Sequence, residues 1–317
     1  MMKTAVMTDT NSGLAIEEAR QRGLYVLPMP VIIDGKDYLE GVDVTHADLY
    51  AAMRAGKDIH SSQPAPGDFI DMWNHIFAEG YDELVYIPMS SGLSGSYETA
   101  CSFANAWSGQ VAVVNNRRIS VTLYESVLEA LRMAQQGMNA AAIKASLEGH
   151  AADSSIYITV NTLEYLKRSG RVTPAGAAIA EILSLKPVLT IQGGKLDAYA
   201  KVRGMKNSQK RMIAATADDL ARRFASFRPD QIRIGAAGTF ENPDDAQRWT
   251  RQLAEAFPQC QVYYQPQGNF AFGKVIPGKA GDGDGSILQI EARHLSCSIA
   301  CHVGINAAGL GISCVQS

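Results

Sequence analysis

The fold class is set by a stretch in the first third of the chain, which reads LVYIPMSSGLSGS from Leu84 to Ser96. Its first part is a short apolar run that predicts a buried strand over Leu84–Ile87. The serines and glycines that follow predict a tight turn, and a helical pattern then runs over Gly95–Trp107. A strand, a turn and a helix in this order form the repeating unit of α/β proteins.

The same alternation of apolar runs and helical patterns continues along the chain. Further strands are predicted at Ala5–Thr8, Tyr25–Ile33, Val111–Val114, Ile156–Val160, Val188–Ile191, Ile232–Ala236 and Val262–Tyr264. One helix is predicted from the capping residue Thr45 to Arg54, and another from the capping residue Asn242 to Phe257. Further helices are predicted over Gly67–Glu79, Leu123–Gln136, Asn139–His150, Thr162–Lys167, Ala175–Leu183 and Lys206–Phe224. We therefore expect an α/β fold with mostly parallel sheets.

The length of 317 residues predicts two domains, each large enough for its own core. The pattern is interrupted at Gly149–Ser155, so we expect an N-terminal α/β domain over residues 1–150 and a C-terminal α/β domain over 151–317. The stretch 265–286 contains six glycines and two prolines, which is typical of a long loop or a hairpin.

The net charge and the hydrophobic pattern bear on which kinds of binding partner are expected. The net charge is −3, so no general electrostatic attraction toward nucleic acid or an anionic membrane is expected. The chain has no apolar run of about 18 residues that would predict a spanning helix. Met1–Val6 leads directly into a strand and lacks the pattern of a signal peptide, so we expect a cytoplasmic protein.

The five cysteines do not predict a disulfide scaffold or a metal site. Cys297, Cys301 and Cys314 lie near His302, but a zinc site would need a second clear pair of ligands. We expect buried thiols and no bound metal. The sequence also lacks the glycine-rich motifs that bind nucleotide phosphates.

Two serine clusters and one histidine allow structural and functional interpretations. Beside Ser90 and Ser91, the stretch Gly92–Ser96 is compatible to the same degree with a capped strand-to-helix turn and with an anion site built from N–H groups and hydroxyls. Ser61-Ser62 lies before a predicted helix, where capping is the favoured interpretation and a binding loop the alternative. A lone histidine among apolar residues, as at His302, is usually part of a core.

Several blocks in the same order resemble the DegV family of bacterial fatty-acid-binding proteins. They are Val6–Thr10, Val26–Val31, Asp34–Tyr38, Gly41–Thr45, Ser61–Pro64, Ser90–Tyr97, Thr162–Val172, Leu185–Leu189 and Lys201–Gly204. Asn115-Asn116 stands where the family has an Asp-Ser pair, and His302–Asn306 replaces a His-x-Gly-Pro-Gly turn. The segment 265–292 looks like an insertion relative to the family.

The resemblance implies a carrier without catalytic residues or a cofactor. A long-chain fatty acid would lie in a pocket between or within the domains, its carboxylate held by Ser61, Ser91 and His302. Ser62, Ser90 and Ser94 lie beside these positions in the sequence, and Arg203 is a candidate for the ligand network or for docking a partner. That partner would be a fatty-acid kinase that forms an acyl phosphate for phospholipid metabolism. Transient membrane contact for loading is also expected.

Two other functions use the same residues or a related fold. A serine hydrolase would use a serine as nucleophile and His302 as base, but the sequence does not identify the orienting acid. A subunit of a dihydroxyacetone-kinase-like enzyme would need a set of metal-binding aspartates, which is not evident. The carrier needs only hydroxyl and N–H donors, because an unpaired buried carboxylate is costly.

Overall fold

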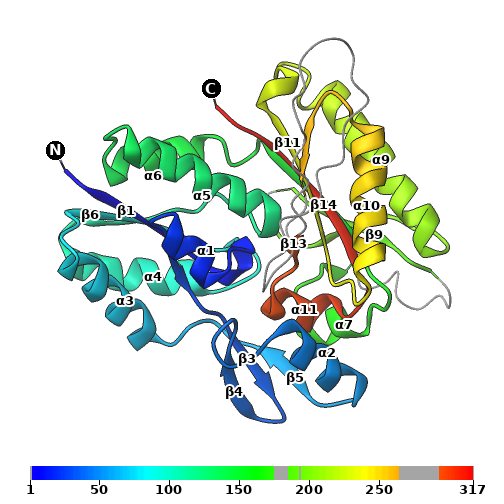
Figure 1. Cartoon of the computed structure of the whole chain (residues 1–317), viewed down its shortest axis with the longest axis horizontal. Helices are drawn as coiled ribbons and strands as arrows, with labels where there is room; N and C mark the ends of the chain where they lie inside the picture. The colour runs from blue at the N-terminus through cyan, green and yellow to red at the C-terminus, as the bar shows by residue number, and fades with distance from the viewer. Residues whose placement is uncertain (1, 175–184, 193, 264–292, 317) are drawn as a thin grey trace. The chain divides into compact units, whose positions relative to one another are not determined.

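The computed structural model describes residues 2–174, 185–192, 194–263 and 293–316 (Figure 1). The chain divides into a first unit of Met1–Ala152, Gly193–Lys195 and Ser296–His302, and a second unit of Asp153–Gln192, Leu196–Leu295 and Val303–Ser317. A short segment near the C-terminus therefore belongs to the first unit. We propose that these units are the two domains. The predicted helix Ala175–Leu183 and the segment 265–292 lie outside the described residues.

A parallel sheet forms the centre of the first unit. Its strands are β1 (Thr4–Asp9), β2 (Tyr25–Leu27), β6 (Glu83–Ile87) and β7 (Val111–Val113), in the order β2-β1-β6-β7 with every pair parallel. Apolar runs suit this position because both faces of a parallel sheet are covered. The predicted α/β class and the predicted parallel sheet are thus confirmed for this unit.

Helices cover both faces of that sheet (Figure 1). On one face lie α5 (Ser120–Gln135) and α6 (Ala140–Gly149); on the other lie α3 (Pro66–Ala78) and α4 (Ser96–Ala104), while α1 (Ile16–Gln21) contacts β2. Phe69 and Trp73 of α3 pack with Tyr86 of β6 in a buried core. This packing holds the end of β6, where the serine turn begins.

A small antiparallel sheet adjoins β2 in the sequence. It contains β3 (Pro30–Ile33), β4 (Lys36–Leu39) and β5 (Ile59–Ser61) in the order β4-β3-β5, and α2 (His46–Arg54) follows β4. The prediction of one strand over Tyr25–Ile33 is wrong, because β2 and β3 belong to different sheets. Pro28, which has no N–H to donate to a sheet, lies between them. The predicted cap of α2 is confirmed by a capping box of Thr45 and Asp48.

The second unit has a mixed sheet in the order β10-β9-β8-β14-β11-β12, with β13 also beside β11. The strands are β8 (Ser154–Thr159), β9 (Val188–Ile191), β10 (Asp197–Ala200), β11 (Ile232–Gly238), β12 (Gln261–Tyr263), β13 (Arg293–His294) and β14 (Ala308–Cys314). Only β12 and β13 pair in parallel with β11. The expectation of mostly parallel sheets is wrong for this unit, because β14 inserts antiparallel between β8 and β11.

Two long helices pack on this mixed sheet. They are α9 (Met205–Arg222) and α10 (Pro243–Ala256). Two short helices are α7 (Glu164–Ser169), in the second unit, and α11 (Cys297–Val303), whose residues up to His302 belong to the first unit. Met212 of α9 and Trp249 of α10 share one buried core with Leu310 of β14.

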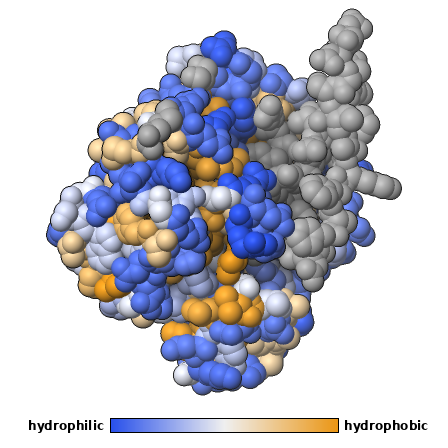
Figure 2. Space-filling model, turned by 60° about the vertical axis from the view of Figure 1, so that its left-hand side comes forward, coloured by the Kyte–Doolittle hydropathy of each residue, from blue (hydrophilic) through white to orange (hydrophobic). Residues whose placement is uncertain are grey.

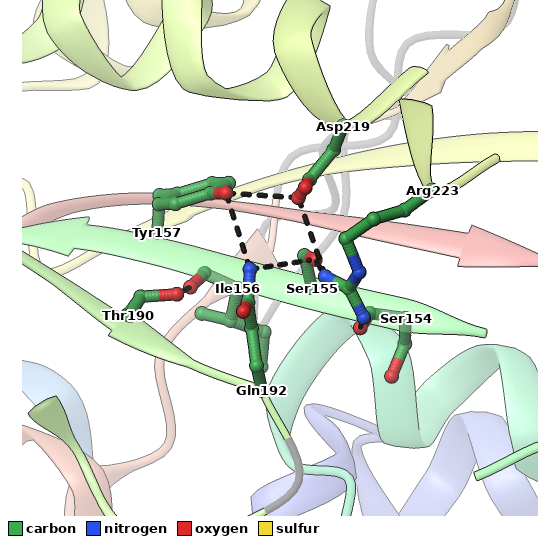
Figure 3. A network of polar contacts seen from close by, with 8 residues as sticks. All are labelled: Ser154, Ser155, Ile156, Tyr157, Thr190, Gln192, Asp219 and Arg223. Carbon is green, nitrogen blue, oxygen red and sulfur yellow. Dashed lines mark hydrogen bonds and ion pairs between the residues drawn. The ribbon is translucent and has the colours of Figure 1, made fainter. Parts of the chain in front are cut away.

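A polar network attaches α9 to the strands (Figure 3). The Tyr157 hydroxyl donates to Asp219 Oδ2 at 2.8 Å, and the Gln192 amide donates to the Tyr157 hydroxyl at 3.3 Å. Arg223 Nη1 donates to the Ser155 hydroxyl and lies 3.5 Å from Asp219 Oδ2. Since Ser155 and Tyr157 are two residues apart on β8, their side chains lie on the same face of the sheet.

The surface exposes few large apolar side chains. Among the described residues, Met2 and Val42 are the large hydrophobic residues that are exposed. Figure 2 shows one face of the molecule, on which hydrophilic residues cover most of the surface and apolar residues are visible between them. Within the part of the chain that the structure describes, no helix is both long and apolar enough to cross a membrane.

Candidate functional site

Ser61 and His302 are in direct contact. Ser61 is the last residue of β5 and His302 lies in the last turn of α11, yet Ser61 Oγ is 2.8 Å from His302 Nε2. Both residues are half-buried. The contact joins positions that are 241 residues apart, and both belong to the first unit. A hydroxyl beside an imidazole can offer two donors to an anion, one from each side chain, when the imidazole Nε2 is protonated.

The capping interpretation of Ser61-Ser62 is wrong. Helix α3 begins at Pro66 with Ala65 as its N-cap, and the Ala65 N–H donates to the carboxylate of Asp68 at 2.8 Å. The Ser62 N–H donates to the Pro30 carbonyl at 3.3 Å, which extends the pairing of β5 with β3. Both hydroxyls therefore belong to the end of a strand and not to the helix start.

The second serine cluster forms a hydrogen-bonded turn after β6. The hydroxyl of the buried Ser90 accepts from the Gly92 N–H at 3.2 Å, and its carbonyl accepts from the N–H groups of Leu93 and Ser94. The Ser94 hydroxyl lies 2.8 Å from that of Ser96, the first residue of α4. The turn is thus fixed internally, and Ser91 and Ser94 remain half-buried at its edge.

Ser91 has a neutral partner. Its hydroxyl donates to Asn115 Oδ1 at 2.9 Å, and the Asn115 N–H donates to Glu148 Oε1 at 2.8 Å. An amide oxygen carries no formal charge, so it fixes the Ser91 hydroxyl without placing a negative charge beside it.

Gln63 connects the two serine loops within the first unit. Its Oε1 accepts from the Thr99 hydroxyl at 3.3 Å, and a Cβ atom at Gly95 would lie 2.8 Å from the same oxygen. Gly92 makes a second close approach, since a Cβ atom there would lie 2.8 Å from the Gly194 carbonyl carbon. Both glycines leave space that any other residue would fill, which allows these segments to pack against the turn.

A buried carboxylate accepts a hydrogen bond from the residue that precedes the second serine turn. Asp9 ends β1, and its two oxygens accept from the N–H groups of Met89 and Asn11, each at 2.9 Å. Met89 directly precedes Ser90, so this bond ties the start of the serine turn to β1. Burial raises the pKa of Asp9 to about 6, although the hydrogen bonds lower it in part.

A second buried carboxylate, Glu40, contacts the start of α11. It accepts from the N–H groups of Cys297 and Ser298 and, at 2.8 Å, from the Thr10 hydroxyl. Burial raises the pKa of Glu40 to about 7, against the opposing effect of these hydrogen bonds. A carboxylate is favourable at a helix start because the first N–H groups lack partners within the helix.

Glu40 also belongs to the one group of metal-type ligands that the described residues form. Ligand atoms of Glu40, His46 and Cys297 lie within 4.8 Å of one another. Both oxygens of Glu40 already accept hydrogen bonds, so we assign this carboxylate to the cap of α11. Cys301 and His302 are not members of the group. Cys297, Cys301 and Cys314 are buried free thiols, as expected.

The two buried carboxyls predict an unusual dependence of folding stability on pH. Their pKa values rise from 3.8 to about 6 for Asp9 and from 4.5 to about 7 for Glu40, so the folded state binds these protons more tightly than the unfolded state. Their stabilisation is therefore complete below the unfolded pKa values and is lost as the pH rises through about 6 to 7. The loss is on the order of 3 kcal/mol for each group.

Urea unfolding at about pH 5 and about pH 8 measures this contribution. Compared with a variant that carries Asp9→Asn and Glu40→Gln, the wild type should lose more stability between the two pH values. Equal changes in the unfolding free energies of the two proteins would contradict the assignment.

The remaining candidate from the sequence is Arg203. It lies in the second unit with an exposed side chain, forms an isolated bridge with Leu185, and its carbonyl accepts from the Asn207 amide at 3.0 Å. Within the first unit, the structure thus brings together Ser61 and His302 and places the Ser90–Ser94 turn next to the Ser61 loop through Gln63. Sequence reasoning missed Asn11 and Glu40, whose burial has no local signal.

Comparisons with known proteins agree with the blocks identified in the sequence. The model of a family described as "Uncharacterised protein, DegV family" matches residues 3–283. A DegV domain-containing protein of Deinococcus radiodurans is 30% identical over 283 residues, covering 89% of this chain and 96% of that protein. A DegV domain-containing protein of Listeria innocua is 29% identical over 283 residues, with the same coverage.

Solved structures show the same fold. A fatty-acid-binding DegV family protein from Thermus thermophilus has a TM-score of 0.80 and 26% identity, covering 99% of this chain and all of that one. A fatty-acid-binding DegV family protein from Streptococcus agalactiae has a TM-score of 0.79 and 25% identity, and both chains are covered completely. Because the family model matches residues 3–283 and the Deinococcus radiodurans relative is 30% identical, this chain belongs to the DegV family.

Proposed function

We propose that this protein binds a long-chain fatty acid and receives its carboxylate at Ser61, Ser91 and His302. The observation that carries the proposal is the 2.8 Å contact between Ser61 Oγ and His302 Nε2, which joins a serine loop to a distant histidine. Family members from Thermus thermophilus and Streptococcus agalactiae that are described as fatty-acid-binding support the choice of ligand.

The chemistry of a fatty acid suits a carrier with a small polar clamp. Burying about 15 methylenes at roughly 0.8 kcal/mol each stabilises the tail by on the order of 12 kcal/mol relative to water. In a membrane the tail is already dry, so transfer between membrane and protein is close to neutral and reversible. The protein must therefore supply hydrogen-bond donors to the carboxylate, because a buried charge without donors costs several kcal/mol.

Ser61 and His302 contact each other and turn toward the ligand when it binds. The hydroxyl of Ser61 donates one hydrogen bond, and a protonated His302 Nε2 donates a charge-assisted one. Ser91 supplies a further hydroxyl, which exchanges its bond to Asn115 for the ligand. Ser62, Ser90 and Ser94 shape the two loops that carry these donors.

The carrier presents the acid to a separate fatty-acid kinase in the cytoplasm, where an acyl phosphate forms for phospholipid metabolism. This part of the proposal rests on what the resemblance to the DegV family implies, and it is compatible with a sequence that lacks the common phosphate-binding motifs. The exposed Arg203 is assigned to docking that partner. Loading requires only transient membrane contact, and neither a cofactor nor nucleic acid takes part.

The ligand is tested by solvent extraction and mass spectrometry of protein purified from cells, followed by uptake of added fatty acid. The expected result is a bound long-chain fatty acid in roughly equimolar amount, or its uptake by empty protein. Empty protein that takes up no fatty acid would refute the proposal. The Ser61–His302 pair also has the geometry of a nucleophile and base, so hydrolysis of a fatty-acyl ester that disappears in Ser61→Ala would favour a serine hydrolase instead.

A further inference from the structure

Helix α11 is too short to hold its own position. It runs from Cys297 to Val303 and carries His302 in its last turn. A helix of two turns is unstable in isolation and takes its place from tertiary contacts. What fixes the start of α11 therefore also decides where His302 lies.

Two buried side chains of the first unit fix that start. Glu40 accepts from the N–H groups of Cys297 and Ser298, and Asn11 Oδ1 accepts from the hydroxyls of Ser296 and Ser298. These four hydrogen bonds end on just two side chains, and the hydroxyl of Ser296, which donates to Asn11, also accepts from the Ile299 N–H at 3.2 Å. Asn11 is 1% exposed and Glu40 is 3% exposed, so water cannot readily replace either of them.

Asn11 and Glu40 are in turn held by the loop that follows β1. The Thr10 hydroxyl donates to Glu40 Oε2 at 2.8 Å, and the Asn11 N–H donates to Asp9 Oδ1 at 2.9 Å. The Asn11 amide also lies 3.0 Å from the sulfur of Met89, which precedes the Ser90 turn. One polar network thus extends from the end of β1 to both the start of α11 and the second serine turn.

The geometry points to Glu40 and Asn11 as positioning residues that set His302 opposite Ser61. From Cys297 to His302 the helix rises by only about 7.5 Å. A shift or tilt of the helix start therefore moves His302 by a similar amount. A hydrogen bond such as that between Ser61 Oγ and His302 Nε2, at 2.8 Å, is lost when the atoms separate by less than about 1 Å. The consequence for ligand affinity rests on the proposed function, whereas the placement of His302 does not.

The first experiment observes His302 directly in the ligand-free protein. With 15N-labelled histidine, the His302 signal is identified by its absence in His302→Ala. Glu40→Ala should shift this signal, because the helix start loses its acceptor. Glu40→Gln should largely restore it, since the amide oxygen can accept from the Cys297 N–H while the NH₂ group donates to the Thr10 hydroxyl.

Glu83→Ala is the matched control. Glu83 Oε2 accepts from the N–H of Ala140, the first residue of α6, at 2.7 Å, so it also caps a helix of the first unit. This helix carries none of the proposed ligand contacts. Glu83→Ala should therefore leave the His302 signal in place, even if it lowers the thermal stability as much as Glu40→Ala does.

A double-mutant cycle then tests whether Glu40 acts through His302. Glu40→Ala should weaken fatty-acid affinity about tenfold in the wild type but less than about twofold in His302→Ala, because the histidine is then already absent. An unchanged His302 signal in folded Glu40→Ala would overturn the inference, as would equal losses of affinity in both backgrounds. If Glu40→Ala does not fold, Asn11→Ala replaces it with the same criteria. A wild type that binds no fatty acid would refute the proposed function, while the His302 signal would still decide the positioning.

Discussion

Replacing His302 with alanine is expected to raise the dissociation constant for a long-chain fatty acid about 10- to 100-fold. A hydrogen bond to a charged group contributes about 1.5–3 kcal/mol, and 1.4 kcal/mol corresponds to a tenfold change. His302 is the only one of the three proposed contacts that can carry a positive charge, so its removal should exceed the effect of either serine. Displacement of a fluorescent fatty acid measures the constant directly.

His75→Ala is the control for this experiment. His75 lies on α3 with a side chain that is 61% exposed and pairs with Glu79, so its loss removes a histidine without touching the proposed clamp. Equal affinities of His302→Ala and His75→Ala, in folded proteins, would exclude His302 as a contact.

Ser61 and His302 should also depend on each other. Ser61→Ala alone should weaken binding several-fold. The variant that combines Ser61→Ala with His302→Ala should lose less affinity than the sum of the two single losses, because the two side chains contact each other directly. Ser91→Ala should add its own loss, because its partner Asn115 is separate from this pair. Strict additivity of Ser61→Ala and His302→Ala would contradict a shared site.

Replacing Trp249 with alanine is expected to destabilise the second unit by about 3–5 kcal/mol. Trp249 lies on α10, is 1% exposed, and its indole N–H donates to the Gly309 carbonyl at 2.8 Å. The substitution removes the largest side chain of this core and leaves an acceptor on β14 without its partner. A loss of this size is a large part of the stability of a domain.

Denaturant unfolding followed by circular dichroism measures that loss. Arg251→Ala, at an exposed position on the same helix, should change the unfolding free energy by less than about 0.5 kcal/mol. A loss below about 1 kcal/mol for Trp249→Ala would mean that α10 does not depend on this packing.

Elements with a clear local pattern could be predicted from the sequence, and their pairing could not. The apolar run at Leu84–Ile87 and the capping box at Thr45 appear where local rules place them. Strand β14 escaped prediction because Gly309 and Gly311 interrupt its apolar run, whereas in the sheet they pair closely with β8 and β11. Its antiparallel insertion depends on residues 70 or more positions away and has no local sign.

In the candidate site, too, local patterns did not predict which residues come together. Local patterns favoured capping for Ser61-Ser62 and a core position for His302, and only the order of the blocks grouped them. The structure brings Ser61 and His302 to 2.8 Å because β5 and α11 meet in the first unit. Glu40 follows a β-strand and precedes Gly41, where a carboxylate is expected to face water. Its burial at the start of α11 is a tertiary effect.

The most direct test of the central claim is the NMR signal of a fatty acid labelled with 13C at its carboxyl carbon. The wild type should show one bound carboxyl resonance, distinct from that of free fatty acid. This resonance should move in Ser61→Ala and in His302→Ala and stay in place in His75→Ala. A bound resonance that is the same in all four proteins would contradict a carboxylate held by Ser61 and His302.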